Sequence, residues 1–400
     1  MAGESYVGTA YTFQTIVVNR ELWAAGRNVK GQLGQNNTTY YSSPVQIPGT
    51  DWKNISFSTG GVYAFKTDNT LWFWGNGDYG ASGLNVGSAY YSSPVQIPGT
   101  TWSRVDVGYH GVHAIRTDGT LWSWGYGNSH GTYGDNNRTQ YSSPIQVGSD
   151  TTWNDLTRIG SQVVSATKTD GTRWIWGSNN EGQLGLNQSD GTVTHYSSPV
   201  QLPGDWASGN KKVSGWSSFS SAIKTDGTLW TWGRNRMGQL GLNQNGHPAT
   251  PVRYSSPVQI PGTNWKYVSS AQYANIATKT DGTLWAWGWN YYGVLGQNES
   301  SYEPSPDNWF ESKSSPCQIP GTNWDAITTG NNTVWATKTD GTFWGWGRNQ
   351  FGAVGDNNED HRSSPVQIPG TDWITGQSAI DRWKGGAPNS TYSFVMIKET

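Results

Sequence analysis

The chain has 400 residues, of which 14% are charged, and its 26 basic and 28 acidic side chains give a formal net charge of −2. No run of Lys or Arg supplies the clustered cations that a sequence-independent grip on nucleic acid needs, so we expect no nucleic-acid partner. The single cysteine, Cys317, excludes a disulfide framework and a cysteine-based zinc site. The first residues carry no secretory-signal pattern, and no apolar run is long enough to span a membrane, so we expect no membrane insertion.

Three phrases recur along the chain. Counting a degenerate first copy, Leu-Trp-x-Trp-Gly ends at Gly26, Gly75, Gly125, Gly177, Gly233, Gly288 and Gly347, at spacings of 49 to 59 residues. Lys-Thr-Asp-Gly-Thr precedes these copies, and close versions of Ser-Ser-Pro-Val-Gln-Ile-Pro-Gly-Thr follow them. Self-similarity at such a period indicates a repeat architecture.

Each repeat predicts four short strands. Asp-Gly between two apolar stretches favours a two-residue type I′ hairpin, so residues 222–224 and 229–232 are expected to pair. The proline-bounded Pro-Val-Gln-Ile-Pro segment predicts a short edge strand, because proline cannot donate a ladder hydrogen bond. Residues 52–57 alternate in polarity and predict the fourth strand.

Seven sets of four strands predict an all-β fold, a seven-bladed β-propeller of four-stranded antiparallel blades, with residues 1–400 forming one domain. Residues 15–21 and 393–399 both align with the strand that precedes Lys-Thr-Asp-Gly-Thr. We therefore expect pairing of the N- and C-terminal strands to close the ring. Which terminus completes the closing blade stays open.

The chain resembles the regulator-of-chromosome-condensation repeat family. The resemblance lies in the Leu-Trp-x-Trp-Gly and Ser-Ser-Pro-Val phrases and in Asn-x-x-Gly-Gln-Leu-Gly at residues 28–34, 180–185 and 235–241, and it covers essentially the whole chain. It implies a seven-bladed propeller. The best-known members are exchange factors for a small GTPase, and their β-wedge cannot be matched here residue by residue. The near-verbatim copies, rich in Trp, Asn and Ser, are similar to bacterial and bacteriophage members.

The repeated tryptophans and aspartates have structural explanations. We expect the Trp rings to fill the wedges between blades rather than to stack on sugars. Turn chemistry explains the hairpin aspartates more simply than a metal or acid–base array does. His113 is expected to be a hydrogen-bonded core residue. Residues 135–137 and 356–358 lack the spacing of a calcium loop, so we expect no metal site and no cofactor.

The repeats differ most in the connection that leads to the Ser-Ser-Pro phrase. This connection lengthens in later repeats, at residues 186–196, 242–254 and 297–313, and a further insertion occupies residues 378–391. Insertions in repeat proteins map to loops on one face, which is often the binding face, and aromatic side chains dominate interface hot spots. The candidate binding residues are Trp309, Phe310, Tyr302, His247 and Tyr254.

No non-repeated Ser, His and Asp stand out as a set, so we expect a non-enzymatic structural or interaction module. The main prediction is a bacteriophage virion component on a capsid, tail or fibre, which contacts another virion protein, a host surface receptor or a glycan. The expected location is the virion, or otherwise the cytoplasm. Two alternatives stay open: an intracellular regulatory scaffold resembling GTPase exchange factors, and a glycan-binding lectin with equivalent shallow pockets in several blades.

Overall fold

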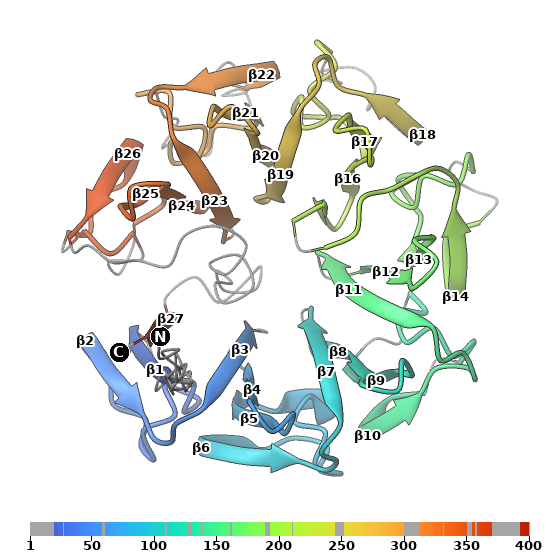
Figure 1. Ribbon diagram of the computed structural model, residues 1–400, viewed down its shortest axis with the longest axis vertical. Coiled ribbons are helices and arrows are strands. Elements are labelled where there is room, and N and C mark those ends of the chain that lie inside the picture. Colours follow the sequence, from blue (N-terminus) through green and yellow to red (C-terminus); the bar gives the residue numbers. More distant parts are fainter. Residues whose placement is uncertain are drawn as a thin grey trace, which may run out of the picture.

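The computed structural model describes residues 20–26, 28–57, 61–108, 110–126, 130–137, 139–160, 162–188, 193–209, 211–244, 252–299, 312–330, 332–349, 354–356, 358–369 and 393–399. These residues form antiparallel sheets that stand around a central axis (Figure 1). The first strand of each four-stranded sheet lies near the axis and the last lies at the rim (Figure 1). The all-β propeller fold is therefore confirmed.

Six sheets have four strands each, in simple sequence order. The first two contain β3 (Trp52–Phe57), β4 (Gly61–Lys66), β5 (Leu71–Asn76) and β6 (Tyr90–Ile97), then β7 (Trp102–Val107), β8 (His110–Arg116), β9 (Leu121–Tyr126) and β10 (Tyr141–Gln146). The next two contain β11 (Trp153–Ile159), β12 (Val163–Lys168), β13 (Arg173–Ser178) and β14 (His195–Leu202), then β15 (Val213–Trp216), β16 (Phe219–Ile223), β17 (Leu229–Arg234) and β18 (Arg253–Gln259). The last two contain β19 (Trp265–Ser270), β20 (Ala274–Lys279), β21 (Leu284–Gly288) and β22 (Lys313–Ile319), then β23 (Trp324–Thr329), β24 (Thr333–Lys338), β25 (Phe343–Gly347) and β26 (Arg362–Ile368). A short 3-10 turn, η1 (Asp78–Gly80), follows β5.

A further sheet has three described strands, in the order β2 (Tyr41–Ile47), β1 (Arg20–Gly26) and β27 (Ser393–Glu399). The expected pairing of the terminal strands is confirmed, because β1 pairs along its length with β27. It is the C-terminal strand that docks beside β1. The expected count of seven four-stranded blades is corrected, since the described residues form six four-stranded blades and this three-stranded sheet.

The Lys-Thr-Asp-Gly-Thr hairpins differ in turn type from the sequence-based expectation. In the hairpin between β12 and β13, Gly171 has a φ of +84°, whereas the preceding Asp170 is not among the residues with positive φ. The Gly171 N–H donates to the Lys168 carbonyl at 3.0 Å, and the Lys168 N–H donates to the Thr172 carbonyl at 3.0 Å. This is a three-residue loop whose last residue is left-handed, rather than a two-residue type I′ turn.

The hairpin aspartates serve the turn, as expected. Asp170 Oδ1 accepts the Thr172 N–H at 2.9 Å and its hydroxyl at 2.7 Å, and the Thr172 hydroxyl accepts Trp174 Nε1–H at 3.0 Å. The hydrogen bond from the Thr172 hydroxyl is the main reason why the pKa of the Asp170 carboxyl lies below its ordinary value. The same Asp-to-Thr pattern lowers the pKa of the corresponding aspartates Asp68, Asp118, Asp226, Asp281 and Asp340.

Asp150 lies beside the same hairpin and predicts a pH-dependent contribution to stability. Its carboxylate contacts Lys168 Nζ at 2.6 Å, and this hydrogen bond, aided by Thr152, lowers its pKa from 3.8 to about 2. A lowered folded-state pKa stabilises the fold above the unfolded-state pKa, and the stabilisation is lost as the pH falls through the folded-state value.

We expect Asp150→Asn to lower the free energy of unfolding at pH 7 by about 1 kcal/mol or less, because the side chain is 33% exposed and solvent screens the pair. The difference from the wild type should shrink between pH 3.8 and about 2. Urea unfolding of both proteins across this range measures it. A difference that persists unchanged below pH 2 would contradict the ion pair as its cause.

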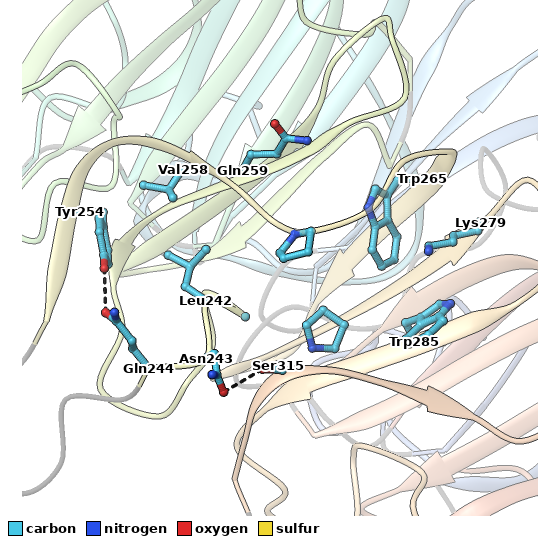
Figure 2. Close-up of a pocket in the computed structure, with 13 residues that line it drawn as sticks. Leu242, Asn243, Gln244, Tyr254, Val258, Gln259, Trp265, Lys279, Trp285 and Ser315 are labelled. Carbon is cyan, nitrogen blue, oxygen red and sulfur yellow. Dashed lines mark hydrogen bonds between the residues drawn. The ribbon is translucent and has the colours of Figure 1, made fainter.

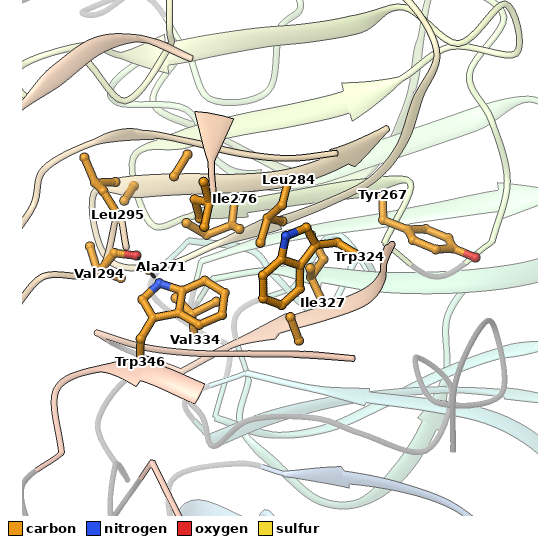
Figure 3. Close-up of a cluster of buried hydrophobic side chains, with 14 of the residues drawn as sticks. Tyr267, Ala271, Ile276, Leu284, Val294, Leu295, Trp324, Ile327, Val334 and Trp346 are labelled. Carbon is orange, nitrogen blue, oxygen red and sulfur yellow. Dashed lines mark hydrogen bonds between the residues drawn. The ribbon is translucent and has the colours of Figure 1, made fainter. Parts of the chain in front are cut away.

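The hydrophobic core lies between neighbouring sheets. Figure 3 shows one such cluster, in which Leu284 and Ile276 of one sheet pack against Trp346 and Ile327 of the next. The second Trp of each Leu-Trp-x-Trp-Gly phrase is fully buried, and its Nε1–H donates at 2.8–3.1 Å to a carbonyl of the preceding repeat; these residues are Trp74, Trp124, Trp176, Trp232, Trp287 and Trp346. Packing between blades therefore accounts for these recurring rings, as expected.

A second connection between blades was not predicted from the sequence. In the described part of the chain, six loops that follow the Trp strands form such a connection and are called latch loops here; they comprise residues 31–36, 80–85, 131–136, 182–187, 238–243 and 293–298. Each ends in an Asn whose backbone N–H donates at 2.6–2.8 Å to the carbonyl of the first Ser of the Ser-Ser-Pro phrase in the next sheet. The Ser-Ser-Pro strand is thus an edge strand, as expected, and the preceding repeat also holds it.

Candidate functional site

A groove of about 560 Å³ lies at the rim, between the sheet ending in β18 and the sheet β19–β22. The latch loop at residues 238–243 and the outer strand β18 form one side of it, and β20, β21 and the start of β22 form the other. Figure 2 shows the residues that line it. It therefore opens where the chain leaves one blade and enters the next.

Two tryptophans and a lysine form one end of the groove. Lys279 Nζ lies 4.7 Å from the ring centroid of Trp265 and 4.8 Å from that of Trp285 (Figure 2). The two rings meet edge to face, with centroids 6.4 Å apart. Trp265 is buried and Trp285 half-buried, because the hydroxyl of Thr283 accepts Trp285 Nε1–H at 2.9 Å and holds that ring at the surface. A cation against two rings gains cation–π attraction while its ammonium stays accessible to water.

The other end of the groove is built from amides, hydroxyls and aliphatic carbon. The Tyr254 hydroxyl donates to Gln244 Oε1 at 2.8 Å, and the Ser315 hydroxyl donates to Asn243 Oδ1 at 3.2 Å (Figure 2). Leu242, Val258 and two prolines, Pro261 and Pro316, supply the apolar surface. A concave site of this kind, apolar with a few fixed polar groups, is suited to binding rather than to chemistry.

The charge of the groove is unbalanced. Lys279 is the one charged residue among those that line it. The nearby hairpin carboxylate of Asp281 is engaged by the N–H and hydroxyl of Thr283, at 2.9 Å and 2.7 Å. The groove therefore presents a positive charge with no carboxylate lining it.

One of the five candidate binding residues lies in this groove. Tyr254 is half-buried there, at the end of the connection 242–254 that varies among repeats. Trp309, Phe310, Tyr302 and His247 lie outside the described residues. Sequence reasoning missed Trp265, Lys279 and Trp285, since they belong to the near-verbatim phrases. A signal was available: a Lys or Arg stands at the position of Lys279 in each of the six four-stranded blades, between two Trp positions.

His113 is a core residue, as expected. It is fully buried, and its Nε2 lies 2.5 Å from the carbonyl oxygen of Thr132 in the latch loop of the same repeat. Its ring meets the Trp176 ring of the next sheet edge to face. His113 thus joins two blades.

The exposed large hydrophobic side chains of the described residues lie in the early repeats. They have exposed fractions of 37% to 58% and are Val29, Tyr40, Tyr79, Val86, Tyr90 and Tyr126. The rings of Tyr79 and Tyr126 contact each other at 5.0 Å, and Lys30 Nζ lies 3.6 Å from the ring centroid of Tyr90. The described part of the chain therefore adds an aromatic surface that the loop-length argument did not predict.

Tyr79 precedes a latch loop whose sequence differs from that of the first repeat. In three repeats the residue before the loop donates its N–H to the Gln of Gly-Gln-Leu-Gly, at 2.7–2.8 Å; these residues are Lys30, Glu181 and Met237. Ala81 replaces that Gln after Tyr79, and Val294 replaces it after Tyr292. Both tyrosines have a φ of +59°, whereas Lys30, at the corresponding position, is not among the residues with positive φ. Loss of one side-chain acceptor thus accompanies the turning of each tyrosine into the left-handed region.

Within the described ranges, no group of three or more His, Cys, Asp or Glu side chains is arranged to hold a metal ion. In the same part of the chain, none of the helices has the length and apolarity required to cross a membrane.

Three successive stretches, residues 226–277, 281–336 and 340–378, match the model of the regulator of chromosome condensation (RCC1) repeat. These stretches lie in the later part of the chain, and the described residues fold into a β-propeller, so the chain contains repeats similar to those of the RCC1 family. No support is found for a bacterial or bacteriophage style of this repeat.

Among curated relatives, the ultraviolet-B receptor UVR8 of Arabidopsis thaliana is 28% identical over 50% of this chain and 42% of its own. The probable E3 ubiquitin-protein ligase HERC4 of Homo sapiens is 30% identical over 34% of this chain and 12% of its own. The chain thus spans less than half the length of either relative.

Solved structures of yeast Prp20 share the fold. Prp20p from Saccharomyces cerevisiae, described with its binding to Gsp1p and histones, gives a TM-score of 0.73 at 18% identity, over 95% of this chain and 92% of that one. Yeast RCC1 (Prp20) bound by Kap60 gives a TM-score of 0.76 at 16% identity, over 100% and 97%. The prediction of a virion location is wrong, because the matched relatives are proteins of a plant, mammals and yeast rather than virion components.

Proposed function

We propose that this chain is a regulatory scaffold that binds a partner protein through its surface and performs no catalysis itself. The observation that carries the proposal is the rim groove, which joins an accessible lysine, a half-buried Trp ring and fixed amide groups at a connection that varies among repeats. The partners named for Prp20 are proteins too, which supports a protein partner here. The name of HERC4 describes a ligase, but the matched stretch covers 12% of that protein, so the proposal does not include ligase activity.

Within this proposal, Tyr254 is the binding residue kept from the five candidates. Its ring stands at the mouth of the groove, and its hydroxyl is held by Gln244 at 2.8 Å, so little side-chain freedom is lost on binding. We also propose that the three-stranded sheet acts as a seventh blade and that residues 1–400 form one ring, since β1 and β27 join the two ends of the chain.

The test is selection of peptides from a displayed library on the wild-type protein, followed by affinity measurement on variants. We expect Tyr254→Ala to weaken the selected peptides by about tenfold or more, because a truncated aromatic hot spot costs about 2 kcal/mol. Tyr141→Ala is the matched control. Tyr141 occupies the strand position that corresponds to Tyr254, but its repeat has Gly148 at the position of the groove residue Pro261. Equal binding to the wild type and to Tyr254→Ala would reject the groove as the site.

The exchange-factor alternative makes a different prediction. An exchange factor speeds nucleotide release from a small GTPase, whereas a scaffold binds its partner without changing that rate. A nucleotide-release assay therefore separates the two.

A further inference from the structure

The rim groove has a counterpart one blade earlier. The thirteen residues that line the groove each have an equivalent in the preceding repeat, and the residue type is the same at all thirteen positions. Leu186 corresponds to Leu242, Tyr196 to Tyr254 and Lys224 to Lys279. These equivalent residues, called the second groove here, lie between the sheet ending in β14 and the sheet β15–β18.

Strand register establishes the correspondence. Tyr254 pairs with Gly233, as Tyr196 pairs with Gly177, the closing glycines of their Trp phrases. The two prolines also recur, Pro203 for Pro261 and Pro257 for Pro316. The equivalence therefore holds in the fold and not only in the sequence.

The polar contacts repeat as well. The Tyr196 hydroxyl donates to Gln188 Oε1, as Tyr254 does to Gln244. Lys224 Nζ lies 3.9 Å from the Trp230 ring centroid and 5.5 Å from that of Trp206, so this lysine also rests against two rings. Both grooves thus present one ammonium, one hydroxyl–amide pair and the same apolar surface.

The remaining blade junctions differ at these positions. Gln35, Asp135, Gln297 and Asp356 replace Leu242 in four of them. The fifth has Leu84 but carries Val86 in place of Gln244 and Arg116 in place of Lys279. The pair of identical grooves is therefore confined to the junctions around the sheet β15–β18.

Lys224 and Lys279, the lysines of the two grooves, differ from Lys168, which occupies the equivalent position in the preceding blade. Lys168 is neutralised by Asp150 at 2.6 Å. Neither Lys224 nor Lys279 has an Asp or Glu within 4 Å among the described residues, and the residues that line the Lys279 groove include no acid. An ammonium half-covered by aromatic rings is partly desolvated, so a carboxylate that reaches it gains more than it would at an open surface.

From these observations we infer that the two grooves form a tandem site for an extended acidic segment of a protein, each groove holding one carboxylate side chain against its Trp-bound lysine. This inference rests on the proposed function and specifies its ligand. Two linked sites raise the overall affinity by effective concentration without any new contact. The partner is thus expected to carry two acidic clusters separated by a flexible or extended stretch.

The test is isothermal titration with a short peptide of alternating Glu and Ser, long enough for one groove only. We expect two peptides to bind per chain, one after Lys279→Gln or Lys224→Gln, and none after both changes together. Lys168→Gln is the matched control, because that lysine already has a carboxylate partner; it should leave two sites. Gln keeps part of the stem that packs on the rings, and thermal melting of each variant verifies the fold.

The other outcomes each overturn a stated part. A stoichiometry of one for the wild type rejects the tandem pair. Equal binding of a Gln-and-Ser peptide at the same two sites rejects the acidic chemistry while the proposed function stands. If peptides selected from the library bind but bypass both grooves, the inference fails together with the proposed function.

Discussion

Replacing Trp346 by Ala is expected to lower the free energy of unfolding by about 3–5 kcal/mol. The Trp346 ring is fully buried between the sheets β19–β22 and β23–β26, among Leu284, Val294 and Ile327 (Figure 3). The substitution removes this ring and leaves a cavity at the junction. It also removes the hydrogen bond that Trp346 Nε1–H donates at 2.9 Å to the Val294 carbonyl. A buried carbonyl that loses its donor adds about 1–3 kcal/mol to such a cost if water cannot enter.

Trp344→Ala is the matched control, because Trp344 lies two residues earlier on the same strand and is half-buried. It loses a cation–π contact, with Lys338 Nζ 4.4 Å from its ring centroid, and an edge-to-face contact with Trp324. We expect about 1–2 kcal/mol for this change. Guanidinium unfolding followed by far-ultraviolet circular dichroism measures both variants. Equal losses would mean that the buried Trp does not join the blades as described.

The local parts of the fold could be predicted from the sequence. The strands beside each hairpin follow from Asp-Gly and from the spacing of the Trp residues, which act over a few positions. The turn type could not be predicted, because a two-residue and a three-residue loop both accommodate Asp-Gly, and the register of the strands chooses between them. In the structure, Lys168 pairs with Thr172, which leaves three residues in the loop.

The hydrogen bonds that connect neighbouring blades could not be predicted from the sequence, for a different physical reason. The N–H of Asn36 donates to the carbonyl of Ser92, and the Asn36 side chain accepts from Ser93, which is 57 residues away. Backbone partners at such separations leave no local pattern. The sequence did not predict the groove, because binding residues were expected where the repeats vary. Lys279 and Trp285 instead belong to the phrases that recur. Comparing repeats position by position reveals the paired grooves without a structure.

A Gly293→Ala change is expected to cost about 2–5 kcal/mol, through two separable effects. Gly293 begins a latch loop and has a φ of +76°, a conformation that costs an L-residue about 1–2 kcal/mol. A Cβ atom there would lie 2.5 Å from Cα and 2.8 Å from Cβ of Ser363, in the edge strand of the next sheet. A backbone atom cannot rotate away as a side chain can, so the blades must separate, and overpacking of this kind costs about a further 1–3 kcal/mol.

Gly171→Ala separates the two effects, because Gly171 also has a positive φ, +84°, but a Cβ there meets no atom within 4 Å. Asn69 occupies the equivalent hairpin position with φ +64°, which shows that a side chain is accommodated there. We therefore expect Gly171→Ala to show the backbone cost alone, about 1–2 kcal/mol. Urea unfolding gives both values. If the two variants lose the same stability, the close approach of the latch loop to Ser363 does not hold the blades together, and hydrogen bonds such as that from Asn298 N–H to the Ser363 carbonyl must do so alone.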